Sequence, residues 1–153
     1  MAVKLGSLRR DIKKQNDGDW IQVAELMDPK TGEIPEFHVR GINYSPFQMA
    51  RSNLIGKLTR RYGTRPAPIE ETHRDEGKLM AQHLLLGWKN ADPPYDPDVA
   101  EEMMCDAACG LQDIIRRCAI EVSEMETQFT SDAAGNSARS SGDSSKAKAA
   151  VAA

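Results

Sequence analysis

The chain has 153 residues, enough for one domain together with an appendage. Its formal net charge of −3 gives no reason to expect the whole molecule to bind nucleic acid or membranes non-specifically. No apolar run approaches the roughly 20 residues that span a bilayer, and the first residues lack the apolar stretch of a secretory signal. The odd number of cysteines argues against a disulfide framework and fits a reducing compartment. We therefore expect a protein that stays in the cytoplasm and enters no membrane.

The first part of the chain predicts a β-hairpin. Residues 1–17 are polar and basic and are expected to form an arm that ends in the turn-forming residues 16–18. Segments 20–27 and 33–42 are rich in aromatic and β-branched residues, and a loop with proline and glycine separates them. The hairpin is therefore placed at residues 19–42, and in its second half apolar and charged side chains alternate, as in a half-buried strand.

Helical patterns dominate the rest of the chain. Four helices are predicted, over residues 46–62, 68–88, 97–104 and 107–128. Residues 130–153 are mostly serine, alanine and glycine with scattered charges, so they are predicted to be disordered. The expected fold class is α+β: an N-terminal β-hairpin followed by a small bundle of the predicted helices and a disordered C-terminal tail. Residues 18–129 would form a single domain.

The second predicted helix and the joint that follows it contain unusual residues. The buried side of this helix is assigned to Ile69, Met80, Leu84 and Trp88. Gly77 weakens its middle by about 1 kcal/mol relative to alanine. In segment 87–97, three prolines prevent the helix from continuing, because each lacks a backbone N–H and fixes φ. Asp96 reads as an N-cap followed by proline at the first helical position. The structural hinge is assigned to Trp88, Pro94, Tyr95 and Pro97.

The cysteines and histidines could suggest a metal site. Cys105 and Cys109 lie four residues apart, and His73 and His83 could complete four ligands. The two close pairs of a structural zinc site are missing, however. Cys118 falls on an apolar stripe, and free cysteine is commonly buried. Core packing is therefore favoured over a metal site.

Catalysis is not indicated by the motifs of the chain. The charged residues 70–76 lie at the start of a predicted helix, where acidic side chains are explained by the helix dipole. There is no nucleophile elbow, phosphate-binding glycine loop or dinucleotide fingerprint. We expect a protein that is not an enzyme and uses no cofactor.

One locally basic patch is present. It consists of Arg51, Lys57, Arg60, Arg61 and Arg65. Such a cluster could contact phosphates of a nucleic acid. A solvated helix face with cations near the helix C-terminus explains it equally simply and is favoured. The acidic surface of a partner protein is a further option, because the whole chain is negatively charged.

Segment 76–136 resembles the tail assembly chaperones of long-tailed bacteriophages. In that family a helix ends in a Gly-Trp-Lys turn, a Pro-aromatic-(Ser/Asp)-Pro step opens the next helix, and a final long helix gives way to Gly-Asn and a polar tail. The matching residues here are Gly87-Trp88-Lys89, Pro94-Tyr95-Asp96-Pro97, the helix ending near Phe129, and Gly135-Asn136. Gly18-Asp19-Trp20-Ile21 and Phe37-His38-Val39-Arg40 resemble the hairpin that precedes the helices in many phage tail and head proteins.

The resemblance implies a non-enzymatic protein of the host cell cytoplasm that acts before the virion is complete. Its partners would be the tape-measure protein, which it keeps soluble, and the tail-tube protein, whose subunits it helps to recruit. An apolar groove or face could hold amphipathic helices of the client. We expect this contact to use exposed members of the group Met103, Met104, Leu111 and Ile115. Self-association is left open.

Two other functions remain as alternatives. A structural virion component, such as a head–tail connector or minor tail protein, would share the hairpin and the small size but would remain in the particle. A DNA-binding regulator would use the basic patch, and its binding would weaken with salt.

Overall fold

The computed structural model describes residue 2 and residues 5–124. The chain separates into two units, of which one is Ile12–Ser123 and the other comprises Met1–Asp11 and Glu124–Ala153. In the second unit the structure describes a 3₁₀-helix, η1, over Leu5–Leu8. The predicted disordered tail lies outside the described residues, as does the predicted last helix beyond residue 124.

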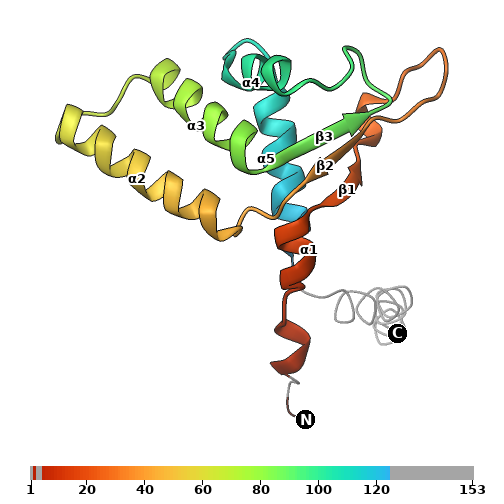
Figure 1. Cartoon of the computed structure of the whole chain (residues 1–153), viewed down its shortest axis with the longest axis horizontal. Coiled ribbons are helices and arrows are strands. Elements are labelled where there is room, and N and C mark those ends of the chain that lie inside the picture. The colour runs from red at the N-terminus through yellow and green to blue at the C-terminus, as the bar shows by residue number, and fades with distance from the viewer. Residues whose placement is uncertain (1, 3–4, 125–153) are drawn as a thin grey trace, which may run out of the picture. The chain divides into compact units, whose positions relative to one another are not determined.

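A three-stranded antiparallel sheet forms one layer of the unit Ile12–Ser123. Its strands are β1 (Asp19–Gln22), β2 (Glu36–Val39) and β3 (Leu85–Lys89), in the order β1-β2-β3. The antiparallel pairing of β1 with β2 confirms the predicted hairpin. A short 3₁₀-helix, η2 (Ala24–Leu26), follows β1. The long connection between β2 and β3 contains two helices (Figure 1).

The prediction that the second helix continues to residue 88 is wrong. The helix ends at His83, and Leu85–Lys89 pairs instead with β2. The run of apolar residues here carries no period that distinguishes a helix from a buried strand. Glycine at position 87 disfavours a helix, and in the sheet it lies opposite His38.

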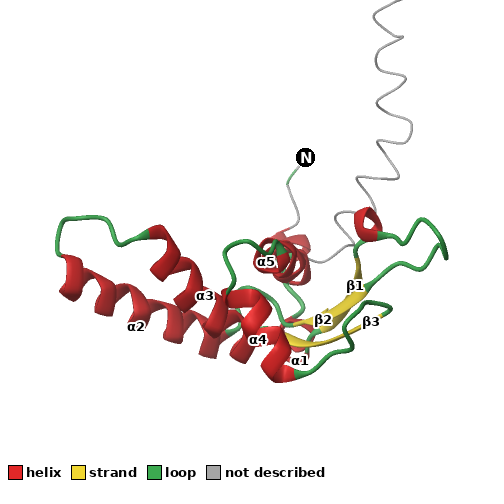
Figure 2. Ribbon diagram, turned by 90° about the horizontal axis from the view of Figure 1, so that it is seen from above, coloured by secondary structure: helices red, strands yellow, loops and turns green. Residues whose placement is uncertain are grey.

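The two faces of the sheet differ in burial. Ile21, Phe37 and Trp88 are cross-strand neighbours, and all three are buried. On the other face Trp20 is 41% exposed and its ring stacks on His38, with the ring centroids 4.9 Å apart. Helix α5 (Leu111–Val122) packs on β2 and lies on one side of the sheet (Figure 2). The sheet therefore has one covered face and one open face.

The helices otherwise follow the predicted pattern with shifted ends. They are α1 (Ile12–Asp17), α2 (Ser45–Tyr62), α3 (Ile69–His83), α4 (Pro97–Cys105) and α5. The short α1 was not predicted and falls within the expected arm. Helix α5 begins at residue 111 and not at 107, because Asp106 caps a turn by accepting a hydrogen bond from the Ala108 backbone nitrogen at 2.9 Å. Ile69 was expected to be buried but is 85% exposed, because it is the first residue of α3.

Helices α2 and α3 form an antiparallel pair (Figure 1). Near its C-terminus α2 is joined to α3 through Glu71, whose carboxylate accepts hydrogen bonds from Arg61 and from the Tyr62 hydroxyl. Among the residues of α2 only Phe47 is buried. Most of the surface of this helix is therefore not covered by the rest of the unit.

A close approach of backbones joins α3 to α4. A side-chain carbon at Gly77 would overlap the Met104 carbonyl, so this position of α3 requires glycine. The buried Gln112 of α5 forms a polar junction with the same region. Its Nε2 donates hydrogen bonds to the carbonyl oxygens of His73 at 2.9 Å and Met104 at 3.0 Å. The glycine that weakens α3 as an isolated helix thus permits its packing.

A second polar junction joins α1 to the end of α5. The Ser123 hydroxyl donates to Gln15 Oε1 at 3.0 Å and accepts a hydrogen bond from the Asn43 backbone nitrogen at 3.1 Å. Gln15 and Ser123 are both buried. Around these two polar junctions lies one apolar core, whose fully buried large side chains are Val39, Met80, Leu84, Met104 and Ile115.

Candidate functional site

The predicted joint between β3 and α4 is organised around Trp88. The indole nitrogen of Trp88 donates a hydrogen bond to the Pro93 carbonyl at 2.7 Å. Its ring meets the Tyr95 ring edge-on, with centroids 5.1 Å apart and an interplanar angle of 88°. The peptide bond between Asp92 and Pro93 is cis. Trp88 therefore anchors the proline-rich segment between β3 and α4, residues 90–96, which we call the elbow. It does so as expected, but from a strand and not from the end of a helix.

The start of α4 is as predicted. The Asp96 carboxylate accepts hydrogen bonds from the backbone nitrogens of Asp98 at 2.8 Å and Val99 at 3.3 Å, and Pro97 follows at the first helical position. This cap fixes where α4 begins, and it sets the direction in which the helix leaves the elbow. Pro94 itself is exposed.

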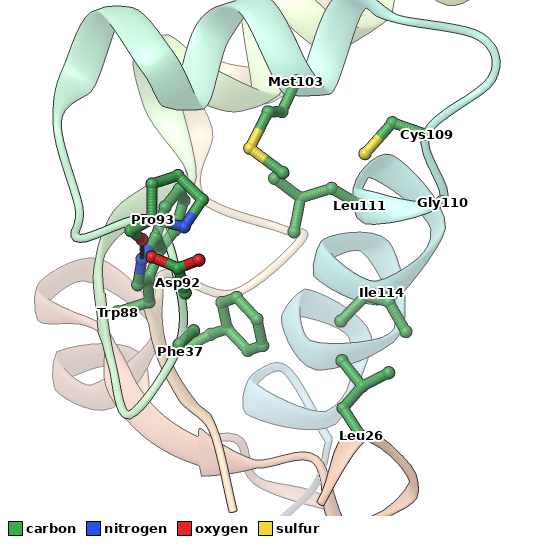
Figure 3. Close-up of a pocket in the computed structure, with 11 residues that line it drawn as sticks. Leu26, Phe37, Trp88, Asp92, Pro93, Met103, Cys109, Gly110, Leu111 and Ile114 are labelled. Carbon is green, nitrogen blue, oxygen red and sulfur yellow. Dashed lines mark hydrogen bonds between the residues drawn. The ribbon is translucent and has the colours of Figure 1, made fainter. Parts of the chain in front are cut away.

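An apolar groove of about 370 Å³ opens between this elbow, η2 and helices α4 and α5. Phe37 and Trp88 form one side, and Leu111 and Ile114 of α5 face them (Figure 3). The whole lining comprises Leu26, Phe37, Trp88, Ala91, Asp92, Pro93, Met103, Cys109, Gly110, Leu111 and Ile114. We call this feature the groove.

The chemistry of the groove suits the binding of apolar side chains. Its size falls within the range usual for ligand sites, and its walls are almost entirely aliphatic or aromatic. Asp92 and Cys109 are the titratable groups among its lining residues, and no histidine is among them. Met103 adds a flexible thioether, which can adapt to partners of different shape.

The residues expected to contact a partner divide into two groups. Met103, which is half-buried, and Leu111, which is buried, line the groove. Met104 and Ile115 are completely buried in the core, so the prediction that they contribute to the exposed contact is wrong. Successive residues of a helix are rotated by about 100°, and Met104 therefore turns to the core when its neighbour Met103 turns to the groove.

Sequence reasoning missed three important residues of the groove. Leu26, Phe37 and Ile114 come from η2, β2 and α5. The helical period places Leu111 and Ile114 on one face of the predicted helix, but it does not indicate that this face borders a groove. No local pattern indicates that Leu26 lies near them.

The basic patch does not form a single face. Arg51, Lys57 and Arg60 are exposed on α2, whereas Arg61 is paired with Glu71. With a rotation of about 100° per residue, Arg51 and Arg60 project from opposite sides of the helix. A flat nucleic acid surface could therefore contact only part of the patch at once.

The cysteines and histidines are not gathered into a metal site. Within residue 2 and residues 5–124, no group of three or more His, Cys, Asp or Glu side chains is placed to hold a metal ion. Cys118 is buried, which raises the pKa of its thiol to about 11. Burial also raises the pKa of Cys105, whose thiol donates to the Arg74 carbonyl at 3.4 Å.

In the part of the chain that the structure describes, no helix is both long and apolar enough to cross a membrane. No protein-family model matches the chain, and neither the curated proteins nor the solved structures contain a match to it.

Proposed function

We propose that this protein is a phage tail assembly chaperone. In this proposal the groove holds an apolar segment of the tape-measure protein while tail-tube subunits are recruited around that protein. The observation that carries the proposal is the open apolar groove itself, built by the elbow and helices of the segment that resembles the family. The protein would act by binding and release, without chemistry.

The form of the groove supports a helical client segment. Two helices and an aromatic side border it, as in the recognition of an amphipathic helix through residues spaced three and four apart. Each Å² of apolar surface removed from water contributes about 25 cal/mol. An apolar segment that fills the groove is therefore stabilised in proportion to the apolar area that it buries there.

The test uses fragments of a phage tape-measure protein. We expect the purified protein to keep such a fragment in solution, measured by light scattering, and to bind it in a titration. Met103→Lys and Ile114→Lys place a charge in the groove and should abolish both effects. Met49→Lys is the matched control, because Met49 is 66% exposed on α2 and does not line the groove.

Two results would contradict the proposal. One is a wild-type protein that neither binds the fragments nor prevents their aggregation. The other is a folded Met103→Lys or Ile114→Lys variant, verified by circular dichroism, that binds as well as the control. Abundant copies in purified virions would instead favour a structural component of the particle.

A further inference from the structure

We infer that the client segment carries a lysine or arginine at the end that leaves the groove beside three carboxylates. These belong to Asp28, Glu33 and Asp92, which we call the acidic rim. The inference rests on the proposed function and adds a charge requirement to the client. It is carried by the continuity between the groove and a second hollow with a different chemistry.

The second hollow, of about 550 Å³, adjoins the groove. Leu26, Phe37, Ala91 and Asp92 line both. Its remaining walls come from the loop between η2 and β2 and from Asn90. Asn90 Nδ2 donates to the Ile34 carbonyl at 3.3 Å and so joins the two sides of the hollow. A segment that leaves the groove past Leu26 and Asp92 therefore enters this hollow.

The carboxylates of the acidic rim are available to a partner. All three residues are exposed. Within the described part of the chain, none of them forms an ion pair. One oxygen of Asp28 accepts a hydrogen bond from the Lys30 backbone nitrogen at 2.8 Å, which holds that carboxylate in the loop. Asp92 lies where the two hollows meet, and Figure 3 shows its carboxylate between Pro93 and Phe37.

The charges along the groove are uneven. The loop of residues 28–35 contains one cation, Lys30, and two carboxylates of the acidic rim, Asp28 and Glu33; the third, Asp92, lies between β3 and α4. On the α5 side of the groove, Ile114 also borders a smaller hollow of about 140 Å³. In this hollow Glu25 is paired with Arg117 through two hydrogen bonds of 2.7 and 3.1 Å. Glu121 is the remaining charged residue there. A cationic end of the client therefore gains more beside the acidic rim.

The rim is expected to select and orient a client and not to supply most of the affinity. Ion pairs at exposed positions each change binding by a factor of about two to five, and salt screens them. Apolar contacts in the groove are less sensitive to salt. Charge complementarity of this kind sets the direction in which a segment lies and disfavours segments of the wrong charge.

The experiment uses the full chain with Trp20→Phe, because Trp88 is then the single tryptophan and reports on the groove. The probes are synthetic amphipathic helices of leucine, alanine and glutamine that differ only at one end. Each peptide carries either two lysines or two glutamates, placed either at its N-terminus or at its C-terminus. At low salt we expect one of the lysine peptides to bind about five- to tenfold more tightly than its glutamate counterpart.

Charge-neutralising variants locate the effect. Glu33→Gln with Asp92→Asn should reduce the difference to about twofold or less, as should high salt. Glu70→Gln with Glu102→Gln removes the same charge from exposed positions that line neither hollow, and it should leave the difference intact.

The possible failures are distinguishable. Equal binding of lysine and glutamate peptides, or equal losses in the two double variants, overturns the charge requirement and leaves the groove as a binding site. If no peptide changes the Trp88 fluorescence or competes with a tape-measure fragment, the use of the groove itself is refuted, and the charge requirement is refuted with it.

Discussion

Trp88 and Pro93 are joined by a hydrogen bond of 2.7 Å from the indole nitrogen to the proline carbonyl. This bond connects the last strand of the sheet to the elbow that leads into α4. Because the same tryptophan ring lines the groove, the bond places the stability of the elbow and the shape of the groove under the control of one side chain.

Trp88→Phe keeps an aromatic ring at this position but removes the hydrogen-bond donor. We expect the free energy of unfolding to fall by about 1–3 kcal/mol, because the Pro93 carbonyl loses its partner. Urea denaturation followed by circular dichroism measures the change. Trp20→Phe is the control, since its ring lies on the open face of the sheet, and a loss under about 1 kcal/mol is expected. Equal losses would show that the bond contributes little.

Gly77→Ala tests the close contact between α3 and α4. The added carbon raises helix propensity but overlaps the Met104 carbonyl, so we expect a net loss of about 1–3 kcal/mol in thermal or urea unfolding. Gly56→Ala in α2 is the matched control. Its added carbon would approach only Arg60 Nη1, at 3.6 Å, and a gain of about 0.5–1 kcal/mol is expected. A gain at both positions would contradict the observed packing.

Ser123→Ala tests the buried junction between α1 and α5. Removal of the hydroxyl leaves Gln15 Oε1 and the Asn43 backbone nitrogen without this partner, and we expect a loss of about 1–3 kcal/mol in urea unfolding. Ser52→Ala, at an exposed position of α2, should change stability by less than about 0.5 kcal/mol. A Ser123 variant as stable as the wild type would refute the importance of the junction.

We expect the folded protein to lose stability at alkaline pH because of the Cys118 thiol. Burial, with a smaller contribution from Glu121, raises its pKa from the ordinary value of 9.0 to about 11. The unfolded chain therefore releases this proton first as the pH rises. The stabilisation is fully present below pH 9 and is lost as the pH passes through about 11. Its size is on the order of 2 kcal/mol.

Urea unfolding at several pH values between about 8 and 11 measures this dependence. Cys118→Ala is less stable throughout because it leaves a cavity, but its stability should fall less steeply over this interval. The slopes are therefore compared, and not the absolute values. Parallel slopes for the variant and the wild type would show that Cys118 does not titrate as expected.

Local patterns made part of this fold predictable. The hairpin follows from two segments rich in aromatic and β-branched residues on either side of a turn-rich loop, and the start of α4 follows from Asp96 and Pro97. Strand β3 was mistaken for helix because its apolar run contains no distinguishing period and because its partner, β2, lies far away in sequence. Secondary structure set by distant pairing cannot be read from a window of the chain.

The groove was only half predictable for the same reason. Met103 and Leu111 lie on helices whose apolar character is visible in the sequence. Their role depends on Leu26 and Phe37, which reach the groove only through the folding of η2 and β2. The neighbouring residues Met103 and Met104 also differ, since Met103 lines the groove and Met104 is buried in the core. The composition of a helix does not indicate which of its sides faces a cavity.

Helix α2 packs chiefly against α3, and Phe47 is its single buried residue. A helix held along one side unfolds locally at lower cost than one enclosed in the core, such as α5. Its amide hydrogens should therefore exchange with solvent sooner than those of α5. Motion of α2 leaves the groove unchanged, because none of the groove residues belongs to this helix.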